Sequence, residues 1–215
     1  MTATATVNAN EAPPRTGRRA QADRRRETRE KVLDAVVAVL VDKGYAGLTT
    51  TDVAQRAGVS RGAQAHYFRT RDDMIVAVTN HLMEQGTALA AAAAESALGS
   101  ADPVAKFLDD AAGFFFHPVY TAMIELVVAS RTHPELGRHY LPLVRRWRGR
   151  IDGIWLTVFQ SAGIPDKRAA VMLQMTNNMM RGIALTSLWD DDIRLRRKLI
   201  REWRAALRLI ADDGA

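Results

Sequence analysis

The chain has 215 residues, a length that allows one domain or a small domain fused to a larger one. The absence of cysteine excludes disulfides, thiolate zinc sites, iron–sulfur clusters and cysteine nucleophiles. The formal net charge of +6 favours a polyanionic partner. The sequence has neither an apolar run of about 18 residues nor a signal-peptide pattern, so we expect a cytoplasmic protein without a membrane span.

The positive charge is concentrated near the N-terminus. Residues 1–31 carry eight basic and four acidic side chains, a net charge of +4, whereas residues 32–75 carry five of each sign. The first 20 residues are small and polar and show no periodicity. Residues 1–23 are therefore predicted to form a disordered basic arm.

A first helix is predicted to begin at about Arg24 and to end at Gly44, which is a C-terminal stop signal directly after Lys43. Apolar side chains recur at the spacing of one helical face, at Leu33, Val36, Val37, Leu40 and Val41. This face is expected to pack into a core.

Three further helices are predicted to begin after capping hydroxyls. Threonines 49–51 precede a short helix that ends before Gly58, and Ser60 precedes a second short helix. Thr70 precedes a long helix that extends to about Ala97. Gly58 can adopt the left-handed conformation that a tight turn between two helices needs.

The remainder of the chain also has a helical pattern. Four prolines fit helix starts, at positions 103, 118, 134 and 165. No alternation of Val, Ile and Thr favours strands. The predicted fold class is all-α, with about nine helices.

Residues 49–74 carry the pattern helix, glycine-containing turn, helix. In a helix-turn-helix unit the second helix can enter the major groove of DNA. Arg61, Gln64 and His66 are expected on or near the exposed face of that second helix. Arg can bind a phosphate or guanine, and Gln can bind adenine through two hydrogen bonds.

The same segment resembles the DNA-binding domain of TetR/AcrR-type bacterial transcriptional regulators. The resemblance covers about residues 26–75 and follows the pattern of that family in order and spacing. Two positions depart from it: Ala65 stands where Tyr is usual, and Arg71 stands where Lys is usual. A weaker resemblance, to the ligand-domain helices of the family, covers residues 125–136. The matching residues of the first segment are Gly44-Tyr45, Thr49-Thr50, Val53-Ala54, Ala57-Gly58-Val59-Ser60, Gly62, His66-Tyr67-Phe68 and Arg71-Asp72-Asp73-Met74.

The resemblance implies a helix-turn-helix DNA-binding domain at residues 24–72 and a helical effector-binding and dimerisation domain at residues 73–215. The basic arm is expected to contact phosphates or to enter the minor groove. Tyr67 has the alternative role of a partly buried core aromatic. The residues expected to contact DNA are Arg24, Arg25, Thr49, Thr50, Thr51, Ser60, Arg61, Gly62, Ala63, Gln64, His66, Tyr67 and Arg71.

The implied effector pocket and dimer interface belong to the second domain. Aromatic residues and methionines with a few polar groups fit a small-molecule pocket, although each apolar residue has the alternative of plain core packing. The pocket candidates are Phe114, His117, Tyr120, Met123, Glu125, Trp155, Met175, Asn178 and Met179. The last two long helices are expected to form the dimer interface through Met172, Met175, Met179, Gly182, Ile183, Leu199, Trp203, Ala206, Leu207 and Ile210.

The predicted function is that of a homodimeric, ligand-responsive transcription factor. It would be a repressor that a small hydrophobic molecule releases from a pseudo-palindromic DNA operator. Two alternatives stay open: an activator or global regulator without an effector, and a helical lipid-binding or enzymatic bundle with a vestigial helix-turn-helix. An enzyme is not expected, because the five histidines lack metal-binding spacing and the sequence has no G-x-S-x-G, P-loop or GxGxxG motif. No catalytic residue, cofactor or metal site is predicted.

Overall fold

The computed structural model describes residues 15–212, and all regular secondary structure in this range is helical. The all-α prediction and the predicted number of helices are confirmed for this part of the chain. Its helices are α1 (Arg15–Lys43), α2 (Thr50–Ala57), α3 (Arg61–Tyr67), α4 (Arg71–Ala97), α5 (Pro103–Phe115), α6 (Pro118–Ala129), α7 (Pro134–Ser161), α8 (Asp166–Thr186) and α9 (Ile193–Asp212).

Side-chain caps fix the starts of α2, α3 and α4 close to the predicted positions. The hydroxyls of Thr49, Ser60 and Thr70 each accept a hydrogen bond from the backbone N–H three residues further along, at 3.0, 3.1 and 3.0 Å. Asp73 completes a capping box by accepting from the backbone N–H of Thr70 at 3.0 Å. Hydrogen bonds from Thr70 hold the pKa of the Asp73 carboxyl below its usual value.

Glycines and prolines fix several other helix ends at the positions predicted from the sequence. Gly44 and Gly58 follow α1 and α2 with φ of 65° and 66°, the left-handed conformation that ends a helix. Prolines occupy the first turns of α5, α6 and α7, and Pro165 directly precedes α8.

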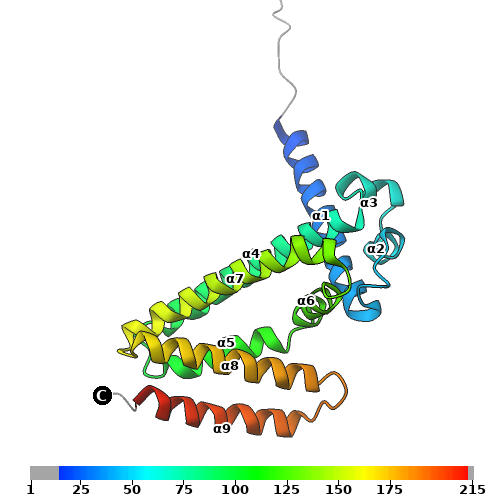
Figure 1. The fold of residues 1–215 in the computed structure, drawn as a ribbon. Coiled ribbons are helices and arrows are strands. Elements are labelled where there is room, and N and C mark those ends of the chain that lie inside the picture. The colour runs from blue at the N-terminus through cyan, green and yellow to red at the C-terminus, as the bar shows by residue number, and fades with distance from the viewer. Residues whose placement is uncertain (1–14, 213–215) are drawn as a thin grey trace, which may run out of the picture.

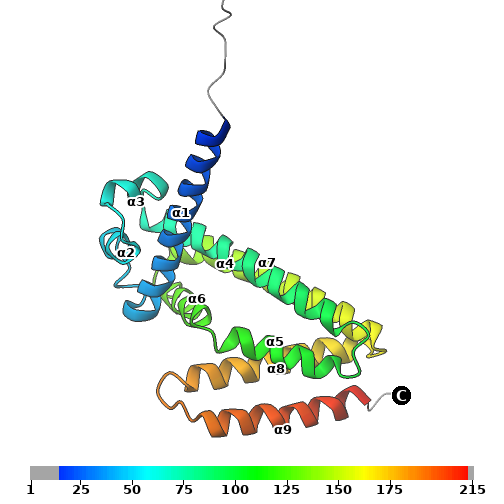
Figure 2. The same ribbon diagram turned by 180° about the vertical axis from the view of Figure 1, so that it is seen from behind.

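Helices α4 and α7 lie side by side as the long axis of the molecule, with α1, α2 and α3 grouped at one end (Figures 1 and 2). α5 and α8 lie between this pair and α9, which forms the side of the molecule opposite α3 (Figures 1 and 2). α4 therefore connects the group of α1 to α3 with the part of the molecule that contains α5, α8 and α9.

Two clusters of buried side chains hold this arrangement together. One lies between the apolar faces of α1 to α4 and is completed by Leu126 of α6 and Tyr140 of α7. The other lies between α4, α5, α7 and α8 and includes the fully buried Trp155 and Phe159. α4 crosses residue 72 without a break, so the boundary predicted there falls inside a continuous helix.

α1 begins at Arg15, nine residues before the predicted start at Arg24. The prediction of disorder is therefore wrong for residues 15–23, whereas residues 1–14 lie outside the described residues. Arg, Gln, Ala and Glu are frequent between residues 18 and 31, and their helix propensity extends α1 beyond its packed part. The apolar periodicity gave no sign of this extension, because it begins only where α1 meets the core, at Val32.

No single helix among the described residues is long and apolar enough to span a membrane. α5 and α6 pass that test only when they are taken together, and the pair is bent by 66° at the break between them. Their inward faces, at Phe107, Leu108, Tyr120 and Leu126, are buried in the two cores.

Candidate functional site

Helices α2 and α3 form a tight corner. Val53 and Ala54 are buried on the inner face of α2, and the small side chain of Ala54 allows α3 to pack close to it. After Gly58, the half-buried Val59 packs against the core of this end of the molecule. Ser60 then caps α3 and is itself exposed, so the N-terminal end of α3 is open to solvent. A helix start of this kind favours an anionic partner.

Arg61, Gly62, Ala65 and His66 are exposed along α3. Nη2 of Arg61 donates to Oγ1 of Thr51 at 2.6 Å, which holds the guanidinium against the first turn of α2. His66 packs edge-on against its half-buried neighbour Tyr67, with ring centroids 5.5 Å apart. This face offers hydrogen-bond donors and acceptors on a helix narrow enough for the major groove of DNA.

Gln64 is a correction to the predicted contacts. Its side chain is only 2% exposed, and Nε2 donates to the carbonyl of Phe68 at 2.9 Å and to the sulfur of Met74 at 3.4 Å. The start of α3 at Arg61 turns position 64 towards α4, so the amide satisfies a carbonyl at the end of α3. Gln64 therefore cannot reach a base edge in this conformation.

Arg71 is also held inside the protein. Its guanidinium carbon lies 3.5 Å from the ring centroid of Tyr45, and Nη2 donates to the Tyr45 carbonyl. Arg71 was predicted to contact DNA, but the ring of Tyr45 beside it provides an intramolecular cation–π partner. Among the other predicted contacts, Thr50 and Ala63 are half-buried, and the exposed residues are Arg24, Arg25, Thr49, Thr51 and Ser60.

Tyr45 is a contact point between the end of α1 and helices α6 and α7, a role that the sequence interpretation did not assign to it. Its backbone N–H donates to Oε2 of Glu125 in α6 at 3.3 Å, and its ring packs edge-on against His133, which precedes α7. Glu125 was predicted to bind ligand, but the structure places its carboxylate at the end of α1. A Cβ at Gly44 would lie 3.0 Å from the same oxygen.

A cavity of about 510 Å³ lies between α4, α5 and α7, with further lining residues from α6 and α8. Phe114, His117 and Trp155, three of the predicted pocket residues, line it. Aromatic contacts build its walls: Phe114 packs on Trp147 with ring centroids 5.2 Å apart, and Phe107 packs on Trp155 at the same separation. Volume and lining are those of a site for a small, mainly apolar molecule.

Five polar side chains line this cavity: Gln85, Asp110, His117, Arg148 and Asn177. Asp110 accepts a hydrogen bond from Nε1 of Trp155 at 3.0 Å. Burial raises the pKa of the Asp110 carboxyl, against the opposing effects of that hydrogen bond and of the Arg148 charge. Arg148 is neutralised in part by Asp152, whose Oδ1 accepts from Nη2 at 2.7 Å.

Several predicted pocket residues lie outside the cavity lining. Tyr120 is buried behind Phe114, with ring centroids 5.6 Å apart, and Met123 packs in the core. Met175 and Asn178 are exposed on α8, and Met179 is half-buried against the core. The prediction missed the wall that α4 provides, which consists of Leu82, Gln85, Gly86, Leu89, Ala90 and Ala93. Their spacing of three or four residues was visible, but small and aliphatic residues carry no distinctive chemistry.

Comparison with known proteins accounts for this combination of a helix-turn-helix corner and a helical cavity. The family model of the bacterial regulatory proteins, tetR family, matches residues 32–78. The HTH-type transcriptional regulator CymR of Pseudomonas putida is 38% identical over 175 residues, which cover 81% of this chain and 86% of CymR. This chain belongs to the TetR family.

Solved structures of TetR-family proteins share the fold. A member from Streptomyces coelicolor A3 gives a TM-score of 0.61 at 21% identity, over 86% of this chain and 98% of that chain. The multidrug binding protein EbrR, complexed with malachite green, gives a TM-score of 0.60 at 21% identity, over 85% and 97%. The chain is thus a helix-turn-helix transcriptional regulator with the fold of its family.

Helices α8 and α9 of this TetR-family regulator, and the connection between them, carry several exposed apolar side chains. Trp189, in the connection between α8 and α9, is 75% exposed, and Met175 of α8 is 43% exposed. Gly182 and Leu199 of the predicted dimer interface are exposed as well. The further exposed apolar residues on these helices and their connection, none of them in the predicted interface, are Val171, Leu188, Ile193, Leu195 and Leu209.

Other predicted interface residues face the interior of the protomer. Met172 and Leu207 are fully buried in its own core, which corrects their assignment to the dimer interface. Trp203 is half-buried, and its Nε1 donates to Oγ1 of Thr176 at 3.0 Å within the same chain. Ile183, Ala206 and Ile210 are half-buried. α8 is apolar on two faces, so a periodic pattern alone could not separate the inner face from the outer one.

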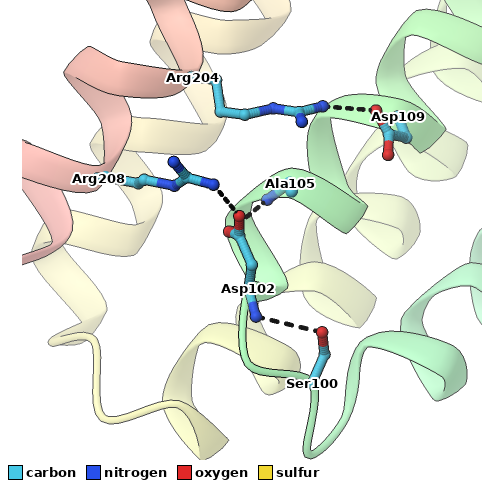
Figure 3. Close-up of polar contacts among 6 residues, drawn as sticks. All are labelled: Ser100, Asp102, Ala105, Asp109, Arg204 and Arg208. Atoms are coloured by element: carbon cyan, nitrogen blue, oxygen red, sulfur yellow. Dashed lines mark hydrogen bonds and ion pairs between the residues drawn. The ribbon is translucent and has the colours of Figure 1, made fainter.

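Two arginines of α9 hold this helix against α5 (Figure 3). Nη2 of Arg204 lies 2.7 Å from Oδ1 of Asp109, and Arg208 pairs with Asp102, which caps α5 (Figure 3). Burial alone would raise the pKa of Asp102, but the hydrogen bond from Arg208 and the cap outweigh it and lower that pKa. Because Asp110, the neighbour of Asp109, lines the cavity, α5 connects the cavity to α9.

Proposed function

We propose that this regulator is a homodimeric repressor that a small molecule releases from its DNA operator. The observation that carries the proposal is the path of α4. This helix begins at Arg71, close after the end of α3, and its residues between Leu82 and Ala93 form one wall of the cavity. A ligand that tilts α4 must also displace α3.

The geometry of α3 explains why such a displacement matters. In a dimeric helix-turn-helix protein the two reading helices enter successive major grooves about 34–36 Å apart. The exposed side chains of Arg61 and His66 are the proposed contacts to base edges, and Thr51 and Ser60 are proposed contacts to phosphates. Gln64 is left out of this set because it is buried, and Arg71 because it is half-buried and held by Tyr45.

The apolar outer faces of α8 and α9 support dimerisation. Exposed apolar side chains gathered on two neighbouring helices are typical of an interaction site. In a twofold dimer the same surface on both copies meets, so Met175, Gly182 and Leu199 would pack against their own symmetry mates. Both helices lie opposite α3, which leaves the two α3 helices free to face DNA (Figure 1).

The cavity defines the chemistry of the effector. Its walls are mainly aromatic and aliphatic, which favours a hydrophobic or aromatic molecule that fits within about 510 Å³. The ligand complex of EbrR, a protein of the same fold, supports a ligand site of this type.

A second route from the cavity to the DNA-binding end supports the same mechanism. His117 and Val119, at the start of α6, line the cavity, and Glu125 of the same helix holds the backbone of Tyr45. Ligand binding can therefore act on the end of α1 through α6 as well as on α3 through α4. Its effect on DNA affinity is limited by the difference in ligand affinity between the two conformations.

The alternative of an activator or global regulator without an effector is less well supported, because it leaves the cavity unexplained. We propose no catalytic activity, since the matching relatives are named as transcriptional regulators. A protein that binds operator DNA functions in the bacterial cytoplasm, where that DNA is located.

The test is a gel shift with DNA from upstream of the protein's own gene, at low salt and against a random duplex of the same length. We expect a shift with preference for the upstream DNA, and release by compounds that raise the thermal stability of the free protein. Absence of any shift at low salt would refute the regulator proposal. Stabilising compounds that leave the shift intact would refute release by an effector.

A further inference from the structure

The N-terminal half of α1 extends beyond the rest of the DNA-binding end and passes beside α3 (Figures 1 and 2). An open groove of about 470 Å³ lies between the two helices. One wall consists of Gln21, Arg24, Arg25 and Thr28 of α1, and the other wall is Tyr67 of α3. This groove adjoins the helix proposed to read DNA, and none of its lining residues is acidic.

Charge is segregated around this part of α1. The groove residues recur at spacings of three, four and seven, which places them on one face of the helix. The acidic residues Asp23, Glu27 and Glu30 recur at spacings of four and seven on another face, roughly 140° around the helix axis from the first. Arg26 is turned away from the groove as well, since its Nη2 pairs with Asp23 at 3.5 Å.

The face of α1 that carries Arg24 and Arg25 lies on the same side of the helix as the face that is buried further along the chain. Val32, Ala35 and Val39 follow Arg25 and Thr28 on the same side of the helix and are buried in the core of α1 to α4. Towards the N-terminus this core ends, and the same face carries Arg24 and Arg25, both exposed. A side that elsewhere is covered by protein is here open and cationic, which fits an anionic partner outside the chain.

The helical conformation decides how this segment can approach DNA. An α-helix with its side chains is about 10–12 Å wide, whereas the minor groove of B-DNA is about 6 Å wide. Residues 15–31 are helical throughout, so they cannot enter the minor groove as an extended arm would. The sugar–phosphate backbone beside the major groove remains as the accessible anionic partner.

We propose that the groove between α1 and α3 binds the phosphate backbone that flanks the half-site contacted by α3. Arg24 and Arg25 supply the positive charges from one wall, and the hydroxyl of Tyr67 supplies a hydrogen bond from the other. This inference rests on the proposed function, because it requires α3 to lie on DNA. It adds a contact that recognises backbone and not sequence, and it lengthens the bound site beyond the bases that α3 reaches.

The experiment compares two neighbouring arginines on different faces of α1. Arg25 lines the groove, and Arg26 is turned away from it. Arg25→Gln and Arg26→Gln each remove one positive charge from an exposed position on the same helix. Affinity for the DNA upstream of the gene is measured by fluorescence anisotropy across a salt series. For Arg25→Gln we expect the slope of log affinity against log salt to fall by about 0.9, and affinity at 0.1 M salt to fall about eightfold. For Arg26→Gln we expect the slope of the natural protein.

Two further measurements sharpen the test. Arg24→Gln combined with Arg25→Gln is expected to reduce the slope by about 1.8. Tyr67→Phe is expected to weaken binding about two- to tenfold with an unchanged slope, because the lost hydroxyl is neutral. Exchange of A·T for G·C pairs in the flanking DNA is expected to leave affinity unchanged, since the backbone is the same.

Equal slopes for the Arg25 and Arg26 variants would overturn the proposal, whether both fell or neither did. A preference for A·T flanks that disappears in the Arg25 variant would indicate minor-groove entry and would also overturn it. An unchanged affinity of Tyr67→Phe would refute the two-walled groove. If the natural protein binds no DNA, the proposed function itself fails, an outcome distinct from normal DNA binding with unaltered slopes.

Discussion

Variants of Gln64 distinguish a structural role of this residue from a role in base recognition. Its buried amide donates to the Phe68 carbonyl and, more weakly, to the Met74 sulfur, so Gln64→Ala removes about 1 kcal/mol of hydrogen bonding and roughly one further kcal/mol from buried side-chain volume. Gln64→Leu keeps the volume and loses only the hydrogen bonds. At about 2–4 °C per kcal/mol for a chain of this size, we expect the Tm to fall by about 4–8 °C for Ala and about 2–4 °C for Leu.

The assay pairs thermal unfolding, followed by circular dichroism, with binding to operator and random duplexes well below the Tm. Both Gln64 variants are expected to keep their preference for operator DNA. The exposed Arg61 provides the opposite control: Arg61→Ala should reduce that preference and change stability by no more than about 0.5 kcal/mol. If Gln64→Leu had an unchanged Tm and lost its preference for the operator, the reasoning would be refuted.

The remaining predictions concern the cavity and the outer faces of α8 and α9. Burial raises the pKa of Asp110, so its carboxylate destabilises the folded state above that pKa, and this cost disappears below the unfolded-state pKa of about 4. Asp110→Asn keeps an acceptor for Trp155 and is expected to be more stable than the natural protein at pH 7. The difference in free energy of unfolding, measured by denaturant titration, should vanish as the pH falls to about 4. A difference that does not depend on pH would contradict this expectation. In analytical ultracentrifugation we expect the natural protein to sediment as a dimer and Met175→Glu to sediment as a folded monomer. Met172→Ala is expected to cost about 2–5 kcal/mol of protomer stability, because Met172 is fully buried. A loss of stability at Met175 together with a loss of association at Met172 would show that the inner and outer faces of α8 have been assigned the wrong way round.

Local chemistry made many of the helix boundaries predictable. Thr49, Ser60 and Thr70 cap helices through contacts that span only three residues, and the glycines and prolines act through their own backbones. The beginning of α1 was missed because it is a helix without a core face, and only its composition indicated it. Local signals of this kind do not depend on how the helices pack.

The site residues were harder to predict because their roles depend on packing. The orientation of Gln64 follows from how the seven-residue α3 meets Met74 of α4, which no spacing within α3 determines. Met172 and Met175 lie on one apolar helix, and only the position of the protomer core separates buried from exposed. The composition of the second domain indicated a pocket, but the α4 wall was missed because its aliphatic residues resemble any packed helix.

The most direct test of the central claim is selection of binding sites by the purified full chain from a library of random DNA duplexes at fixed salt. We expect enrichment of an inverted repeat with half-site centres about 10–10.5 base pairs apart, or a multiple of this spacing, as two α3 helices of one dimer require. The Arg61→Ala protein should lose this enrichment. Recovery of unrelated sequences by the natural protein, or of a single site without twofold symmetry, would rule out a dimer that reads DNA through two α3 helices.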